Sequence, residues 1–333
     1  MRTGVSYFGS RDPRHVKRDL ADIVAHNCNF VVHTYSEADM YFYSAVMKEI
    51  VDISHDAGLD VYIDPWGVGG VFGGEALSRF VAEHPDECQQ LADGTHVPAA
   101  CLNSEAFLDF MKMWVFSAMN TGADIIFWDE PHFYITPETW SGRQGQSQWA
   151  CRCKRCRDLF RDKFARDMPV VMDKDVIRFR DDSIVNFFTE LAEYGSSLGV
   201  RNALCILPDE TPLKGVSSWE LLAQIESIDI LGTDPYWLIW DKPLEDYVAR
   251  CSRRIIDIAG RYGKEAQVWV LAFMIPQGRE EEVARAVKIM VDQGIENIAA
   301  WSYLGGAFMN IKSDNHERVW EILGEAYGEI VSR

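Results

Sequence analysis

Eight short apolar segments alternate along the chain with longer segments of helical periodicity, and this alternation restricts the fold more than any other feature. Several of the helical segments are followed by a glycine, such as Gly58, Gly122 and Gly199, which is typical of a helix C-cap before a strand. The predicted strands cover residues 4–9, 30–35, 61–65, 125–129, 203–208, 228–233, 268–273 and 298–303. The main predicted helices cover residues 41–57, 104–120, 182–198, 244–261, 280–293 and 315–331.

Apolar strands that are separated by helices indicate a parallel sheet covered by helices. Eight such units in 333 residues predict a (β/α)8 TIM barrel, with an open doubly wound α/β sheet as the alternative. We expect one domain over residues 1–333, with insertions at 66–103 and 131–169 that follow strands three and four. In a barrel these long βα loops lie at the carboxyl-terminal mouth, where barrel enzymes carry their active sites.

The charge of the chain excludes several classes of partner. The chain has 33 Lys and Arg against 51 Asp and Glu, so its formal net charge is −18. Nucleic acids and anionic membranes need a basic face, and we therefore expect neither as a partner. No apolar run approaches the about 18 residues of a membrane-spanning helix, and no secretory signal is recognisable, so we expect a cytoplasmic protein. A homo-oligomer is possible.

Carboxylates end four of the predicted strands, and aromatic residues accompany most of them. Aromatic faces stack on sugar rings, carboxylates accept hydrogen bonds from hydroxyls, and crowded acids raise one another's pKa, as a general acid requires. Taken singly, a strand-end Asp can also cap a helix, a Trp can pack in the core, and a His can be an ordinary loop residue. The candidates are Asp64 and Trp66 after strand three, Asp129, Glu130 and His132 after strand four, Glu210 after strand five, Asp234, Tyr236 and Trp237 after strand six, and Trp301 and Tyr303 at strand eight.

Three of the eight cysteines fall within six residues, in a Cys-x-Cys-x-x-Cys pattern that leads into a helical segment. Cys151, Cys153 and Cys156 suit Zn²⁺, and a structural zinc site needs a fourth ligand. Cys101, in the other long loop, is the first candidate, and Cys88 is the alternative. Such a structural zinc would pin the two insertions together. Reduced free thiols and a catalytic metal are the alternatives.

These features together resemble glycoside hydrolase family 42, the zinc-containing β-galactosidases with catalytic acids after strands four and seven of a barrel. The resemblance implies that Cys101 completes the zinc site with the three clustered cysteines. It also implies that Glu130, in the sequence Phe-Trp-Asp-Glu-Pro, is the acid/base. The specific motifs cover residues 60–165, and elsewhere the likeness is to the barrel alone.

Two positions differ from that family. The asparagine that precedes the acid/base is Asp129 here, and strand seven ends in Ala-Phe-Met without a glutamate nucleophile. Asp234 is our first choice for the partner carboxylate, ahead of Asp64 and Glu210. A separation of about 5 Å from Glu130 favours a nucleophile, and about 6.5–9.5 Å favours a base that activates water.

The leading hypothesis is a glycoside hydrolase-like enzyme that acts on a carbohydrate. In it Glu130 is the general acid/base, Asp234 the partner, and Asp129 and Asp64 orient hydroxyls, while three tryptophans (Trp66, Trp237 and Trp301) stack on sugar rings. The second hypothesis is a metal-assisted lyase or isomerase of a sugar or sugar acid, with Mg²⁺ or Mn²⁺ between strand-end acids and His132 as the base. The third is a carbohydrate-binding barrel that has lost catalysis.

Overall fold

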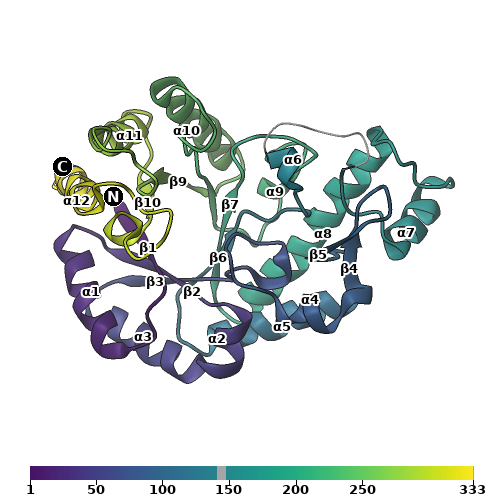
Figure 1. Cartoon of the computed structure of the whole chain (residues 1–333), viewed down its shortest axis with the longest axis horizontal. Helices are drawn as coiled ribbons and strands as arrows, with labels where there is room; N and C mark the ends of the chain where they lie inside the picture. Colours follow the sequence, from purple (N-terminus) through teal and green to yellow (C-terminus); the bar gives the residue numbers. More distant parts are fainter. Residues whose placement is uncertain (141–147, 333) are drawn as a thin grey trace.

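A computed structural model of the chain, which describes residues 1–140 and 148–332, contains a closed barrel of eight parallel strands (Figure 1). The order around the barrel is β1-β10-β9-β8-β7-β6-β3-β2, so neighbours in the chain are neighbours in the barrel. The predicted (β/α)8 barrel is therefore confirmed. The strands are β1 (Arg2–Tyr7), β2 (Phe30–Thr34), β3 (Asp60–Asp64), β6 (Ile125–Asp129), β7 (Arg201–Ile206), β8 (Ile230–Thr233), β9 (Glu265–Leu271) and β10 (Asn297–Trp301).

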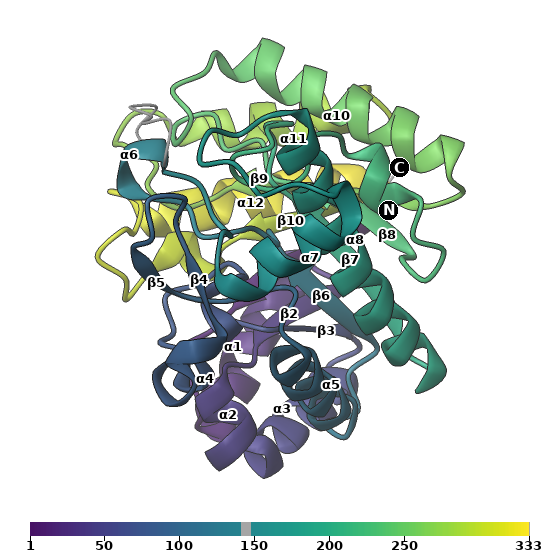
Figure 2. The ribbon, with the colours of Figure 1, turned by 90° about the vertical axis from the view of Figure 1, so that its right-hand side faces the viewer.

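Helices surround the barrel (Figure 2), and most of them bury an apolar stripe against it. The predicted helix 41–57 is broken at Tyr43, and the helix predicted at 182 begins earlier, because Asp173 caps the backbone amides of Asp175 and Val176. The helices around the barrel are α1 (Pro13–Ala25), α2 (Glu37–Phe42), α3 (Ser44–Asp56), α5 (Glu105–Met119), α8 (Lys174–Ser197), α9 (Glu220–Ala223), α10 (Leu244–Arg261), α11 (Glu281–Asp292) and α12 (His316–Val331), with the short 3-10 helix η3 (Tyr303–Gly306). None of the helices that the structure describes is long and apolar enough to cross a membrane.

The two expected insertions lie side by side at the right of Figure 1 and are joined by backbone contacts. Leu91 pairs with Ala150 as an isolated antiparallel bridge, and the amide of Ala92 donates to the carbonyl of Trp149 over 2.9 Å. Residues 141–147 of the second insertion lie outside the described residues. The elements of the insertions are η1 (Val68–Gly70), α4 (Arg79–Glu83), η2 (Pro85–Glu87), the hairpin β4 (Cys88–Gln90) and β5 (His96–Ala100), α6 (Pro137–Trp140) and α7 (Lys154–Phe164).

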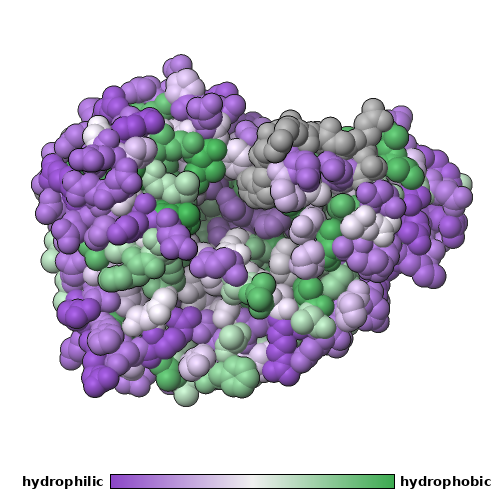
Figure 3. Space-filling model, viewed as in Figure 1, coloured by the Kyte–Doolittle hydropathy of each residue, from purple (hydrophilic) through white to green (hydrophobic). Residues whose placement is uncertain are grey.

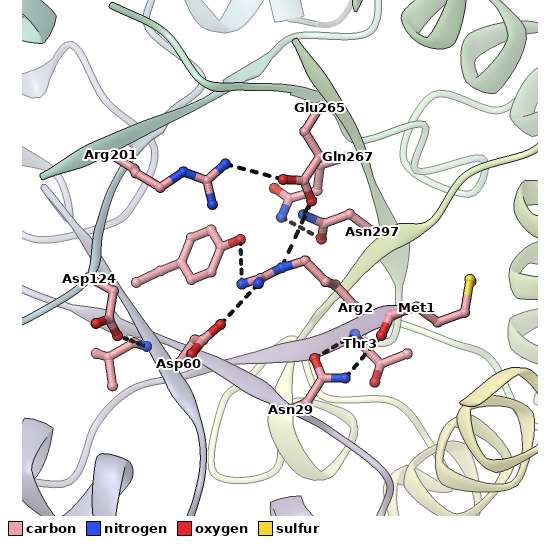
Figure 4. A network of polar contacts seen from close by, with 12 residues as sticks. Met1, Arg2, Thr3, Asn29, Asp60, Asp124, Arg201, Glu265, Gln267 and Asn297 are labelled. Carbon is pink, nitrogen blue, oxygen red and sulfur yellow. Dashed lines mark hydrogen bonds and ion pairs between the residues drawn. The ribbon is translucent and has the colours of Figure 1, made fainter. Parts of the chain in front are cut away.

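A network of charged side chains closes the end of the barrel where the strands begin (Figure 4). Arg2 forms an ion pair with Asp60 over 2.9 Å, and Glu265 accepts a hydrogen bond from Asn297 over 2.6 Å and pairs with Arg201 over 3.3 Å. These ion pairs and this hydrogen bond link side chains from different strands, so the network stabilises this end of the barrel. The chemistry of a barrel is expected at the opposite end, beyond the carboxyl ends of the strands.

Candidate active site and candidate metal centre

A cavity of about 320 Å³ opens at the carboxyl ends of the strands, and Figure 3 shows a hollow near the centre of one face. It is lined by Asp129 at the end of β6, by Glu130 directly after it and by Asp234 directly after β8, and Glu75 of the loop after β3 is a fourth acid. Besides Asp129, five other residues that the sequence singled out line this one cavity. They are Glu130, Asp234, Tyr236, Trp66 and Trp301.

Asp64, at the end of β3, is fully buried and does not line the cavity. Among the described residues, neither of its carboxylate oxygens has a hydrogen-bond partner. Burial raises the pKa of Asp64 well above its ordinary value, and the charges of Asp129 and Glu130 raise it further. The pKa of Asp129 is also raised, first by burial and then by Glu130. The acid cluster therefore retains protons at a pH where isolated carboxyls are ionised.

Glu130 and Asp234 belong to the same cluster and both line the cavity. Burial raises the pKa of Asp234 well above its ordinary value, followed by the charge of Glu130 and by a side-chain hydrogen bond between the two. The charge of Glu130 therefore favours the protonated form of Asp234. Glu130 adopts a left-handed φ of 41°, and its amide donates to the carbonyl of Cys205 over 3.1 Å. Such strained backbone is concentrated at functional sites.

The glycine-rich loop after β3 packs tightly against the acids. The amide of Gly73 donates to the carbonyl of Asp129 over 3.1 Å. A Cβ atom at Gly73 would lie 2.0 Å from the Asp129 carboxylate, and one at Gly74 would lie 2.4 Å from the Trp66 ring. Glycine is therefore required here for close approach of the backbone, and the loop forms one wall of the cavity.

Three aromatic rings stack beside the acids. The ring of Trp66 stacks on that of Trp301 with centroids 5.0 Å apart, and Phe8 stacks on Trp301 at 5.2 Å. Trp66 follows β3, Trp301 ends β10 and Phe8 follows β1, so three strand ends contribute. The stack gives the cavity a broad apolar wall of the kind on which a sugar ring can lie.

Two of the predicted site residues lie elsewhere. The carboxylate of Glu210 accepts a hydrogen bond from the amide of Trp219 over 3.0 Å and pairs with Arg254 over 3.0 Å, outside the cavity. Trp237 is buried in the core, where its indole N–H donates to Glu282 over 2.7 Å. The structure thus gives Glu210 a role in holding α9 and α10, and it leaves Trp237 no ring face toward the cavity.

His132 and Tyr303 lie near the cavity without lining it. Nδ1 of His132 is 2.6 Å from the carbonyl oxygen of Glu130, and burial lowers the pKa of this histidine. The hydroxyl of Tyr303 donates to Asp22 over 3.1 Å, and its ring lines a neighbouring cavity of about 470 Å³. His132 therefore supports the backbone of the acid, and Tyr303 belongs to the adjoining space.

Four residues near the acids were absent from the sequence-based candidates. Glu75 lines both cavities, Phe8 belongs to the ring stack, and Cys205 lines the main cavity between β6 and β8. Burial lowers the pKa of Lys214, while the charges of Asp209, Glu130 and Asp234 raise it, so this cation lies close to the acid pair. Phe8 ends a predicted strand and Glu75 lies in a long βα loop, which are signals that could have identified both.

Four buried thiols form a second site between the insertions. The Sγ atoms of Cys101, Cys151, Cys153 and Cys156 all lie within 4.8 Å of one another. Cys101 Sγ lies 3.5 Å from that of Cys156, 3.7 Å from Cys153 and 3.9 Å from Cys151. Cys88, the alternative fourth ligand, is not in this group, since its thiol faces the carbonyl of His84 at 3.4 Å. The four cysteines could hold a metal ion.

The surroundings of the thiols suit a metal centre that carries net negative charge. The buried guanidinium of Arg180 lies close enough to Cys151 and Cys156 for their charges to act on it. The amide of Asn103 points at Cys156 Sγ over 3.4 Å. Positive charge and an N–H donor beside sulfur both stabilise thiolates, the form that binds metal.

Asp64→Asn tests whether the acid cluster lowers stability. The raised pKa means that the folded state of the wild type holds a proton that the unfolded state releases, so its stability falls as pH rises above about 4. We expect the variant to be more stable by about 1–3 kcal/mol at pH 8, because an amide removes a buried acid and donates to its neighbours. Urea unfolding at pH 5–8 measures this. A difference that does not grow with pH contradicts the prediction.

Comparison with known proteins supports the fold. No family model matches the chain, and no curated protein matches it significantly. The endo-1,4-β-mannanase of Rhizomucor miehei is similar in structure, with a TM-score of 0.64 at 11% identity over 98% of this chain and 95% of that one. The endo-β-1,4-mannanase of Thermotoga petrophila gives 0.59 at 10% identity over 98% and 76%. D-allulose 3-epimerase from Methylomonas sp. gives 0.52 at 9% identity over 100% and 97%. At these identities the likeness shows that the chain shares the barrel of sugar-processing enzymes.

Proposed function

We propose that this protein is a glycoside hydrolase in which Glu130 is the general acid/base and Asp234 is the partner carboxylate. One observation carries the proposal: these two carboxyl groups line one cavity that the stacked rings of Trp66 and Trp301 also line. A pair of carboxyls that shares one proton supplies both an acid and a base. The rings beside it offer an apolar surface to a sugar.

We propose a retaining reaction for this pair, and the separation of the two carboxyl groups is what distinguishes it from an inverting one. An inverting enzyme holds its carboxyls about 6.5–9.5 Å apart to admit a water, whereas a retaining enzyme holds them at about 5–5.5 Å. Glu130 protonates the glycosidic oxygen as its bond to the anomeric carbon breaks, and the Asp234 carboxylate bonds to that carbon. Water then displaces Asp234 and gives its proton to Glu130.

The other polar groups have supporting roles in this scheme. Asp129, which lines the cavity, binds substrate hydroxyls, while Asp64, which is fully buried and does not line the cavity, acts only through the acids beside it. Tyr236, whose pKa is raised by burial and by Asp234, keeps its hydroxyl proton and can donate it in a hydrogen bond. The position after β9, where family 42 carries its nucleophile, is taken by Phe273 and Met274. The proposal therefore assigns the nucleophile to the end of β8.

We further propose that the four cysteines bind a structural Zn²⁺, as the resemblance to family 42 implies. In a tetrahedral site with Zn–S bonds of about 2.3 Å, the sulfur atoms lie about 3.8 Å apart. The sulfur separations of 3.5, 3.7 and 3.9 Å around Cys101 fit that value. Four thiolates leave no open position on zinc, so the ion holds the insertions and takes no part in the reaction.

A panel of aryl glycosides tests the activity directly. Nitrophenyl glycosides of mannose, glucose, galactose and N-acetylglucosamine, in both anomers, are to be incubated with the protein, and released nitrophenol is measured. We expect turnover of at least one of them, with retention of anomeric configuration by NMR. If the protein binds a sugar but releases nitrophenol from none of these glycosides, the result supports a carbohydrate-binding protein without catalysis. The absence of an acid directly after β9 favours this alternative.

The metal-assisted alternative has weaker support. It places Mg²⁺ or Mn²⁺ between Asp64, an acid at the end of β6, and Glu210. Since Glu210 is engaged with Arg254 outside the cavity, this set of ligands does not converge. In the part of the chain that the structure describes, the cysteine quartet is the one group of three or more such ligands within mutual reach of an ion.

A further inference from the structure

We infer that the substrate is a glycoside of an apolar aglycone, an alkyl chain or an aromatic ring, which lies on one side of the cavity mouth. This inference rests on the proposed function and adds the chemical class of the leaving group. The surface concerned, which we call the apolar rim, is formed by Ile239, Met274, Phe308, Met309 and Ile311. These residues come from the loops after β8, β9 and β10.

The apolar rim exposes large hydrophobic side chains to solvent. Phe308 is 95% exposed, and Met274, Ile311 and Ile239 are 45%, 44% and 41% exposed. The amide of Met274 donates to the carbonyl of Ile311 over 3.1 Å, which joins two of the loops. Figure 3 shows hydrophobic residues next to the central hollow. Clustered exposed apolar residues of this kind mark binding surfaces.

The apolar rim is continuous with the acid pair. Ile239, Met309 and Ile311 line the same cavity as Glu130 and Asp234. Met309 also lines the adjoining cavity, whose wall includes Phe308. A ligand whose reacting bond reaches the acids therefore passes these side chains on its way to solvent. This continuity identifies the occupant as part of the substrate.

Two residues of the rim hold a backbone conformation that does not suit them. Met274 has a φ of 54° and Phe308 a φ of 73°, in the left-handed region that large apolar residues rarely adopt. Asparagine or glycine would fit both positions with less strain and without exposing an apolar side chain. Met274 and Phe308 each lower stability through a strained backbone and through an exposed apolar side chain. Residues of this kind are expected on a surface where function requires them.

The chemistry of the rim selects an apolar group over a second sugar. Sugar hydroxyls that leave water need hydrogen-bond partners, and the side chains of the rim offer none. An alkyl or aryl group loses no hydrogen bonds there and gains the favourable burial of apolar surface. The sugar ring then occupies the acid end of the cavity, and the aglycone lies outward on the rim.

The test compares ligands that differ only in the aglycone and that resist hydrolysis. Methyl and n-octyl 1-thio-β-D-glucopyranoside, galactopyranoside and mannopyranoside are titrated into the full chain below the micellar concentration, with binding followed by calorimetry. We expect the octyl ligand of at least one sugar to bind tenfold or more tightly than its methyl counterpart. In the double variant Met274→Asn with Phe308→Asn, the preference should fall to twofold or less. Its melting temperature and its affinity for the methyl ligand should not fall.

Matched variants and further outcomes decide the inference. Met113→Gln with Phe116→Gln removes the same side-chain types from exposed positions on α5 and should keep the octyl preference. An octyl preference that is absent, or that survives in the rim variant, overturns the inference. So does a wild type that dimerises in sedimentation while the rim variant does not, because a second copy then covers the rim. An octyl preference without turnover of any aryl glycoside supports the inference and rejects the proposed hydrolase.

Discussion

Replacement of Cys101 by serine is expected to abolish stoichiometric metal binding and to lower the melting temperature by several degrees. Cys101 is the residue of the first insertion that joins the three cysteines of the second. A serine hydroxyl is a poor ligand for a soft site, so the remaining thiols lose their common centre. Removing the ion releases both insertions, for which we expect a loss of about 3 kcal/mol or more of unfolding free energy. Metal content and thermal unfolding measure the two effects.

Cys88→Ser is the matched control, since Cys88 is buried in the same insertion and its thiol faces backbone carbonyls. This variant should retain one metal ion per chain. Equal metal loss in the two variants, or an unchanged metal content in Cys101→Ser, contradicts the assignment of the fourth ligand. Zinc in protein that is purified without added metal supports the choice of ion.

The cysteine cluster is also linked to the segment that follows β6 through the first insertion. The buried side chain of Gln89 donates to the carbonyl of Ala100, next to Cys101, and accepts from the amide of Tyr134, four residues beyond Glu130. Loss of the ion is therefore expected to move the segment that follows the acid. The catalytic rate should fall together with stability in Cys101→Ser and remain unchanged in Cys88→Ser.

The fold and the grouping of the four cysteines could be predicted because their signals are local in the sequence. Each strand and helix carries its own periodicity, and the barrel follows from their alternation. The spacing of the three clustered cysteines alone predicts that they lie together, and Cys101 lies in the facing long loop. Glu130 and Asp234 met at one mouth for the same reason, since parallel strands bring their carboxyl ends together.

Some residues were predicted at the cavity but lie elsewhere, because their positions depend on the path of the chain after a strand ends. Glu210 lies four residues beyond the last residue of β7, where the loop has already turned toward Arg254. Trp237 lies four residues beyond β8 and turns into the core instead of the mouth. Phe8 and Glu75 lie at positions that could have identified them as candidates, but their approach to the cavity depends on tertiary contacts, such as that of Phe8 with Trp301.

Glu130→Gln and Asp234→Asn are expected to abolish most glycoside hydrolysis, but with different dependence on the leaving group. Glutamine cannot protonate the departing oxygen, so kcat/KM should fall about 10²–10⁴-fold on glycosides of poor leaving groups and less on dinitrophenyl glycosides. Asparagine cannot bond to the anomeric carbon, so the loss in Asp234→Asn should reach roughly 10⁴-fold or more with every leaving group. Steady-state kinetics on a leaving-group series separates the two roles.

The pH dependence gives a second, independent test of the shared proton. Activity requires one proton on the pair, so kcat/KM of the wild type should fall both when the pair is fully protonated and when it is fully ionised. The charge of Glu130 raises the pKa of Asp234, and Glu130→Gln removes that charge, so Asp234 should ionise at lower pH in this variant. The residual activity of Glu130→Gln should therefore lack the alkaline limb and keep an acidic limb that is shifted downward.

Glu210→Gln is the matched control for both substitutions, because it removes a carboxylate that follows a neighbouring strand and lies outside the cavity. Its kcat/KM should stay within about twofold of the wild type, with a loss of stability of about 1 kcal/mol or less from the broken ion pair with Arg254. Equal leaving-group dependence in Glu130→Gln and Asp234→Asn would mean that the roles are not divided between these two acids. Glu210 does not line the cavity. A fall in kcat/KM of Glu210→Gln as large as that in Glu130→Gln and Asp234→Asn would therefore place the reaction outside the cavity.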